Sequence, residues 1–188
     1  MGRADEGPGW QVWNWGPECP WDEPLKARFN AVFRDVDTIL LSRKILEGGY
    51  VDHWSQFARD YGDNPDFAFA QRIVDARKVV FCRTLQMTKW AGTELALRPL
   101  VEEVDALKAE SERDLIAFGG AGFTPALVAN DLVDEYQFFV NPVPLREGLS
   151  IFRERGVDSH LELREAEGYA CGIVVIRYNA HSRAKAKP

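Results

Sequence analysis

The sequence predicts an α/β fold with three layers: a mostly parallel, twisted sheet, helices on both of its faces, and antiparallel strands at its C-terminal end. Two observations carry this prediction. Short apolar runs alternate with helical patterns between residues 22 and 130, and strand-like runs follow after residue 133 without a helix between the last two. A third is the glycine-rich turn Gly119-Gly120-Ala121-Gly122, which lies between an apolar run and a helical pattern. A buried parallel strand delivers its carboxyl end to a helix N-terminus in this way, and phosphates bind readily there.

The first half of the chain is predicted to begin with a helix that Asp22 caps and that runs to about Arg34, with apolar residues at helical spacing. Asn64 and Pro65 mark the start of another helix, because asparagine caps and proline opens helices. The elements predicted in this half, in order, are the helix 22–34, a strand 37–41, a short helix ending near Gly48-Gly49, a polar aromatic loop 50–64, a helix 65–76 and a strand 78–82.

The second half continues the alternation and then changes character. Pro99 opens a helix that carries Leu100, Val104 and Leu107 on one face. The predicted elements are a strand 93–97, the helix from Pro99, a strand 114–118, a helix 123–130, and strands 135–140, 159–164 and 172–178. No helix need separate the last two strands, so we expect an antiparallel pair that closes the sheet.

Size and composition are those of one domain, predicted over residues 1–180, with a frayed basic tail at 181–188. The formal net charge of -6 argues against a general nucleic-acid binder. No apolar run reaches the roughly 18 residues that span a bilayer. Three widely separated cysteines show neither metal-ligand spacing nor a disulfide framework, so we expect no metal site and a cytoplasmic protein with reduced thiols. Cys82 and Cys171 lie in apolar runs and are interpreted as small core residues.

Residues 1–21 are rich in glycine, proline and tryptophan. The tryptophans of this stretch have two possible interpretations; they are Trp10, Trp13, Trp15 and Trp21. Their indoles cover the core from a loop, or some of them wall a pocket for a flat ligand.

Three predicted strands end in comparable turns. These are Ser42-Arg43-Lys44, Cys82-Arg83-Thr84 and Gly119-Gly120-Ala121-Gly122. Ligands of open α/β sheets bind beyond the carboxyl ends of the strands. Two arginines and a glycine turn at that edge suit a ligand with several phosphates.

The ordered set of motifs resembles the dihydrofolate reductase-like superfamily, and more closely the branch that contains the reductase domain of bacterial riboflavin biosynthesis. The matching segments are Asp37-Thr38-Ile39-Leu40-Leu41-Ser42-Arg43-Lys44, Lys78-Val79-Val80-Phe81-Cys82-Arg83-Thr84-Leu85, Leu115-Ile116-Ala117-Phe118-Gly119-Gly120 and Leu132-Val133-Asp134-Glu135-Tyr136 through Asn141-Pro142-Val143. With the final strands they cover most of residues 22–178.

The resemblance implies an NADPH-dependent reductase of a pterin-like or pyrimidine-like small molecule, in a homodimer. It implies that the turn of Ser42, Arg43 and Lys44 meets the nucleotide phosphates. The turn of Cys82, Arg83 and Thr84 would hold the adenosine end, with the arginine favouring the 2′-phosphate. The turn from Gly119 to Gly122 would lie against the diphosphate and nicotinamide.

Several positions depart from the family pattern. The first turn of the family is usually Gly-Arg-x-Thr, whereas Ser42 and Ile45 stand here, Cys82 replaces a frequent serine, and Arg146 stands where relatives often have glycine. The family's first apolar strand is missing from the sequence as given. Three explanations for the missing strand stay open: a segment upstream of the given sequence, replacement by the stretch Trp10–Trp15, or a sheet with an altered middle. These departures motivate an alternative function: a degenerate member that binds a nucleotide or pterin without turnover, or acts only as a dimeric scaffold. A third alternative is a non-reductase nucleotide binder that shares only the strand-end architecture.

A proton donor for the reduction is not evident. Asp22 precedes the first helix near the place of a family acid, but an aspartate there also caps a helix. His53 is predicted in a loop beside Trp54, as an acid, a substrate contact or a solvated side chain.

Overall fold

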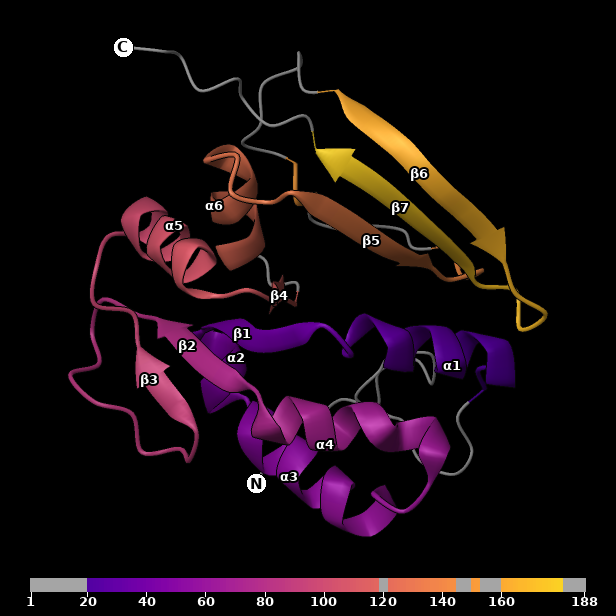
Figure 1. Cartoon of the computed structure of the whole chain (residues 1–188), viewed down its shortest axis with the longest axis horizontal. Helices are drawn as coiled ribbons and strands as arrows, with labels where there is room; N and C mark the ends of the chain where they lie inside the picture. Colours follow the sequence, from indigo (N-terminus) through magenta and orange to yellow (C-terminus); the bar gives the residue numbers. More distant parts are fainter. Residues whose placement is uncertain (1–19, 119–121, 145–149, 153–159, 181–188) are drawn as a thin grey trace.

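The computed structural model describes residues 20–118, 122–144, 150–152 and 160–180, and its strands form two sheets (Figure 1). The first sheet is parallel, with the strand order β3-β2-β1-β4, and the second is antiparallel, with the order β5-β7-β6. The strands are β1 (Val36–Ser42), β2 (Arg77–Phe81), β3 (Thr93–Leu95), β4 (Asp114–Ala117), β5 (Glu135–Val140), β6 (Leu161–Gly168) and β7 (Val174–Ala180). The predicted α/β class, with a parallel sheet followed by antiparallel strands, is confirmed. Among the described residues, the antiparallel strands pair only with one another, and not with the parallel sheet that they were expected to close.

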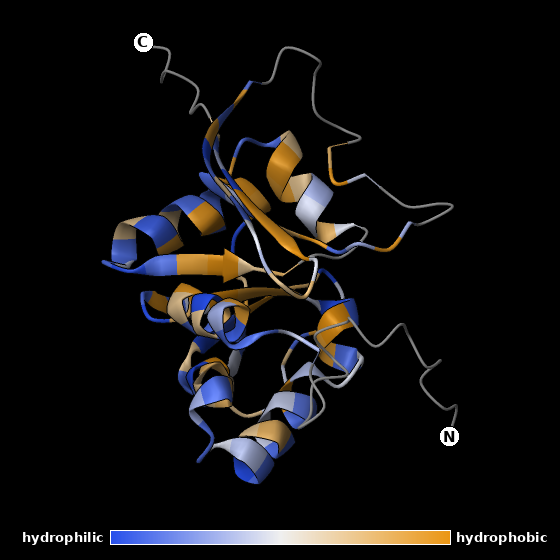
Figure 2. Ribbon diagram, turned by 90° about the vertical axis from the view of Figure 1, so that its right-hand side faces the viewer, coloured by the Kyte–Doolittle hydropathy of each residue, from blue (hydrophilic) through white to orange (hydrophobic). Residues whose placement is uncertain are grey.

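Helices cover both faces of the parallel sheet, with α5 and α6 on one side and α3 and α4 on the other (Figure 1). The helical elements are α1 (Glu23–Val32), α2 (Arg43–Glu47), α3 (Tyr50–Tyr61), the 3-10 turn η2 (Pro65–Phe67), α4 (Ala68–Asp75), α5 (Leu100–Glu110) and α6 (Phe123–Ala129). Figure 2 shows hydrophobic residues concentrated in the strands and on the helix faces turned toward them.

The three layers follow from the two-residue period of the central strands. In β1, Ile39 and Leu41 pack into the core on the side of α3 and α4, whereas Leu40 packs with α5 and α6. In β2, Val80 packs on the side of α3 and α4, and Val79 packs on the side of α5 and α6. Successive side chains of a strand point to opposite faces. A continuous apolar run therefore fills two cores, which confirms the three-layer prediction.

Helix α1 packs between the antiparallel sheet and α4 through aromatic contacts. The ring of Phe29 lies 5.6 Å from that of Phe139 in β5, and 5.0 Å from that of Phe69 in α4. Trp21 is 4 % exposed and stacks on Phe139 at 5.4 Å. Trp21 therefore agrees with the interpretation in which the indoles cover the core. The other three tryptophans of this stretch, Trp10, Trp13 and Trp15, lie outside the described residues.

The loop predicted over residues 50–64 is wrong, because most of it is helix α3. Tyr50, Val51, Trp54, Phe57 and Ala58 are all buried, and they recur at the i, i+3, i+4, i+7 spacing of one helix face. Polar residues between them give the segment its loop-like composition. The helix begins after Gly49, whose φ of 93° is a left-handed conformation that glycine adopts without strain.

Between the two sheets, β4 pairs with β1 alone and β5 pairs with β7 alone, as far as the described residues show. In Figure 1, β4 lies between β1 and β5. Of the explanations for a missing first strand, the one that invokes Trp10–Trp15 concerns residues outside the described ones, and all three stay predictions. The described helices include none that is long and apolar enough to cross a membrane.

Candidate functional site

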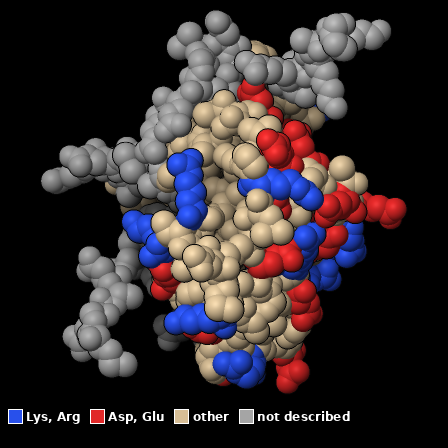
Figure 3. Space-filling model, turned by 90° about the vertical axis from the view of Figure 1, so that its left-hand side faces the viewer, with Lys and Arg blue, Asp and Glu red and all other residues tan. Residues whose placement is uncertain are grey.

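The carboxyl ends of β1 and β2 lie side by side, because the two strands are parallel and Ser42 pairs with Phe81. The third turn follows β4, which lies on the other side of β1, with Leu40 opposite Ala117. Figure 3 shows this face of the molecule, with Lys and Arg side chains spread over it and acidic ones gathered toward one side. The carboxyl ends of the three strands that precede the predicted turns therefore lie at one edge of the sheet.

Arg43 is the residue through which the first two turns meet. Its Nη1 donates a hydrogen bond of 2.6 Å to the hydroxyl of Thr84, 41 residues away in the chain. Its Nε donates to Oε1 of Glu47 at 2.8 Å, one helical turn further along α2. A guanidinium has five N–H donors. The remaining donors of Arg43 are thus held in a defined orientation at the sheet edge.

Glu47 is a site residue that the sequence interpretation missed. Its hydrogen bond to Arg43 raises the pKa of the guanidinium, whose charge is permanent in any case. The i,i+4 spacing of Arg43 and Glu47 was the available signal, because such pairs are neighbours on a helix surface.

Cys82 departs from its interpretation as a small core residue. It is only partly buried, and its sulfur accepts hydrogen bonds from the backbone N–H groups of Thr84, at 3.4 Å, and Leu85, at 3.3 Å. The Thr84 hydroxyl lies 3.4 Å from the same sulfur and contributes most to lowering the pKa of the Cys82 thiol. Because β2 ends at Phe81, Cys82 belongs to the polar turn and not to the buried strand.

Lys44 and Arg83 are the exposed cations of the two turns. Within the described part of the chain, neither the Lys44 ammonium nor the Arg83 guanidinium has a hydrogen-bond or ion-pair partner. Ser42, in contrast, is used internally, because its Oγ accepts the N–H of Ile45 at 3.4 Å and caps α2. The serine that replaces the family's glycine is thus part of the start of this short helix.

The glycine turn is described only at its end. Gly119, Gly120 and Ala121 lie outside the described residues, as does Arg146. Gly122 precedes α6, and a Cβ built on it would meet nothing within 4 Å. The packing of this chain therefore does not itself demand a glycine at position 122.

Asp22 is engaged in structural contacts. One carboxylate oxygen accepts the N–H of Leu25 at 3.0 Å and caps α1, and the other accepts the N–H of Cys171 at 3.1 Å. Both oxygens thus hold the backbone, which agrees with the capping interpretation.

His53 lies in α3 and not in a loop. Its ring packs edge-on against Trp54, with 4.7 Å between the ring centroids, and burial lowers the pKa of the imidazole. A histidine of this kind is neutral at physiological pH.

Comparison with known proteins agrees with this architecture. The chain is 27% identical over 153 residues to the uncharacterized protein YyaP of Bacillus subtilis, a match that covers 80% of this chain and 78% of that one. A protein from Shewanella sp. PV-4, provisionally assigned to riboflavin biosynthesis, superposes with a TM-score of 0.60 at 17% identity, over 81% and 78% of the two chains.

Dihydrofolate reductase from Enterococcus faecalis, whose structure is a complex with NADP(H), superposes with a TM-score of 0.54 at 16% identity, over 87% of this chain and 85% of that one. At such identities the superpositions establish the fold. The family model of the RibD C-terminal domain matches residues 2–175. The chain therefore belongs to the RibD C-terminal domain family, within the dihydrofolate reductase-like fold.

Proposed function

We propose that this protein is an NADPH-dependent reductase that transfers hydride to a pterin-like or pyrimidine-like small molecule. The observation that carries the proposal is the convergence of cations on the edge formed by β1 and β2. Arg43 is fixed there by Thr84 and Glu47, and Lys44 and Arg83 stand beside it without partners in the described residues.

This donor set suits the phosphate groups of NADPH. Guanidinium groups bind phosphate oxygens in pairs, and an ammonium adds a point charge. Arg43 and Lys44 would hold the phosphates that link the two nucleosides. Arg83 and Thr84 would hold the 2′-phosphate, which distinguishes NADPH from NADH.

The cofactor, when bound, supplies the hydride, and the protein's part is to position the two reactants and exclude water. Both carboxylate oxygens of Asp22, the acid that the resemblance suggested, hold backbone N–H groups. We therefore assign the proton to a water molecule.

The experiment is a titration of the purified protein with NADPH, followed by its fluorescence, together with NADPH oxidation assays on pterin, pyrimidine and flavin-precursor substrates. We expect saturable binding and oxidation with at least one substrate class. Absence of binding at millimolar NADPH would contradict the proposal.

A second candidate, binding of nucleotide or pterin without turnover, is favoured by the structural use of Ser42 and Asp22. Asp22→Asn tests whether the carboxylate has a catalytic part, because asparagine also caps helices. Its single oxygen cannot accept the N–H groups of both Leu25 and Cys171, so thermal unfolding of the variant is measured beside its turnover. If water is the donor, Asp22→Asn keeps the turnover of the wild type; a loss of 100-fold or so would identify Asp22 as an acid. NADPH binding with no oxidation of any substrate would establish the second candidate.

We also propose that the protein is a homodimer, as the resemblance implied. Size-exclusion chromatography with light scattering measures this directly, and a mass equal to that of one 21.3 kDa chain would contradict it.

A further inference from the structure

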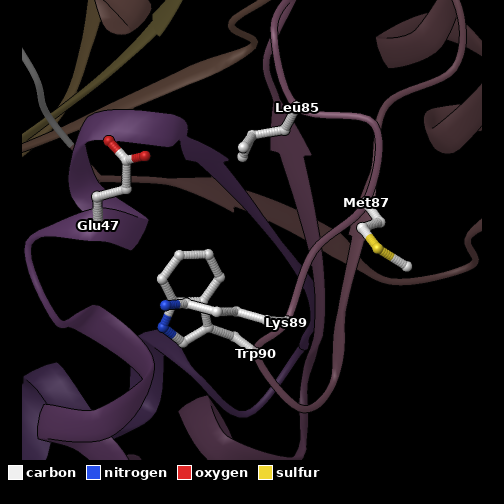
Figure 4. A pocket seen from close by; sticks show the side chains of 5 residues that line it. All are labelled: Glu47, Leu85, Met87, Lys89 and Trp90. Atoms are coloured by element: carbon white, nitrogen blue, oxygen red, sulfur yellow. The ribbon is translucent and has the colours of Figure 1, made fainter.

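Two hollows lie beside the connection from β2 to β3, and each is lined by a lysine. The larger has a volume of about 440 Å³ (Figure 4). Its lysine, Lys89, is exposed, and the ammonium lies over the Trp90 ring, 5.0 Å from the ring centroid. The smaller hollow has a volume of about 120 Å³, and its lysine, Lys78, is only 2 % exposed. The smaller hollow therefore has a buried cation in its wall, which is rare in proteins unless the charge is paired.

The smaller hollow lies on the side of the parallel sheet that α3 and α4 cover (Figure 1). Besides Lys78, its wall consists of Val51, Trp54, Ser55, Val74, Ala91 and Gly92. A volume of about 120 Å³ is the space of about four water molecules. The cavity thus has room for a molecule of three or four heavy atoms, with a cation on one side and apolar side chains on others.

Among the described residues, two of the three N–H groups of the Lys78 ammonium have partners. Its Nζ donates hydrogen bonds of 2.8 Å to the carbonyl oxygens of Val74 and Ala76, at the end of α4. The same Nζ lies 3.9 Å from the place that a Cβ would take on Gly92. Val74 and Gly92 both line the cavity, so the ammonium lies at its wall. The third N–H group of Lys78 can therefore serve a ligand there.

The charge of Lys78 has no ion-pair partner among the described residues. Burial lowers the pKa of the ammonium, and the nearby charge of Asp75 opposes this. The Asp75 carboxylate itself accepts a hydrogen bond of 2.8 Å from Gln71. The carbonyl groups at the end of α4 offset part of the positive charge. A buried charge that lacks a counter-ion is costly, and an anion in the cavity would lower that cost.

We propose that this cavity binds a small monovalent carboxylate, of the size of formate or acetate. One carboxylate oxygen accepts the third N–H group of Lys78, and the methyl group of acetate lies against Val51 and Val74. Lys78 is near the amino end of β2, whereas the proposed phosphate site follows the carboxyl end of that strand. The carboxylate site is therefore distinct from the cofactor site and does not depend on the proposed reductase function.

The test is a titration of the intact protein with sodium acetate, followed by the amide NMR signal of Gly92. Sodium gluconate, whose anion is too large for the cavity, keeps the ionic strength constant. We expect a saturable shift at millimolar acetate and none with acetamide, which has the shape of acetate without its charge. Nitrate, an inorganic anion of the same size, should bind more weakly, because it has no methyl group. Absence of a shift with acetate, an equal shift with acetamide, or tighter binding of nitrate would overturn the proposal.

Lys78→Met keeps the apolar stem of the side chain and removes its charge, so it should weaken acetate by about tenfold or more. The matched control is Lys89→Met, the same substitution at the exposed lysine of the larger hollow, and it should change the affinity by less than about twofold. Unchanged affinity in Lys78→Met would overturn the proposal.

Lys78→Met also removes two hydrogen bonds at the end of α4, so a second variant tests the site without touching them. Ser55→Leu places a larger side chain at the cavity wall, and leucine is a better helix former than serine. It should abolish the saturable shift of Gly92, and thermal unfolding checks that both variants are folded. An unchanged shift in Ser55→Leu would contradict the location of the site, whereas failure of NADPH to bind leaves this proposal untouched.

Discussion

Arg43 links the turn after β2 to helix α2, because its guanidinium donates hydrogen bonds to Thr84 and to Glu47. The contact between Arg43 and the turn of Thr84 could be predicted, because the carboxyl ends of neighbouring parallel strands lie at one edge of the sheet. The hydrogen bond of 2.6 Å between the two side chains agrees with this. The second partner of Arg43, Glu47, could also be predicted, because residues four apart in the sequence are neighbours on a helix surface. The state of Cys82 could not be predicted, because it depends on where β2 ends, and a shift of one residue moves a thiol from core to turn.

The Cys82 thiol provides a prediction at this scale. Its pKa is lowered by hydrogen bonds, first of all from the Thr84 hydroxyl, so the thiolate forms at a lower pH than in an ordinary cysteine. Thr84→Val removes that hydroxyl and should shift the pH midpoint of Cys82 alkylation by iodoacetamide upward. Mass spectrometry of the Cys82 peptide separates its reaction from those of Cys19 and Cys171. An unchanged midpoint would mean that the hydroxyl does not stabilise the thiolate.

Among the elements, the strands were predictable and one helix was not. The runs at 37–41 and 78–82 contain the continuous apolar stretches Ile39-Leu40-Leu41 and Val79-Val80-Phe81 and are bounded by turns, which is typical of strands buried on both faces. Helix α3 has a clear apolar face, but Asp52, His53 and Gln56 interrupt the run and give it a polar composition. The signal that indicates this helix is the spacing of its apolar residues, and not how many of them it has.

Gly49 provides the prediction for α3. Its φ of 93° strains any residue with a Cβ, so Gly49→Ala should lower the free energy of unfolding by about 1–2 kcal/mol. Gly168→Ala is the control, since its φ is not positive and a Cβ there would meet nothing within 4 Å. Urea denaturation measures both. Equal stabilities of the two variants would contradict the strain at Gly49.

In the whole molecule, α1 is joined to the antiparallel sheet by aromatic packing and by a charge network. Arg28 of α1 donates two hydrogen bonds to Glu165 of β6, at 2.9 and 2.7 Å, and Arg177 of β7 contacts both Glu165 and Glu135. The parallel and antiparallel character of the sheets was readable from the spacing of elements. The contacts between α1 and β6 could not be predicted from the sequence, because Arg28 and Glu165 are 137 residues apart and no local pattern links them.

The network predicts a pH dependence of stability. Arg28 holds the pKa of Glu165 below its ordinary value, so the unfolded chain binds the proton more readily. The stabilisation is complete above the pKa of an unfolded glutamate, about 4.3. It is lost as the pH falls through the lower folded pKa. Glu165→Gln should therefore be less stable than wild type at pH 6, and this difference should shrink at acidic pH. A constant difference in urea denaturation across this range would contradict the network's role.

The proposed function places NADPH at the edge formed by β1 and β2, and the most direct measurement compares NADPH with NADH by calorimetric titration. Wild type should bind NADPH more tightly than NADH. Arg83→Ala should weaken NADPH by about tenfold or more, which is the loss of a charge-assisted phosphate contact, and should change NADH little. The control Arg164→Ala should alter neither. Equal weakening of both cofactors by Arg83→Ala, or no binding of either to the wild type, would contradict the assignment of this edge.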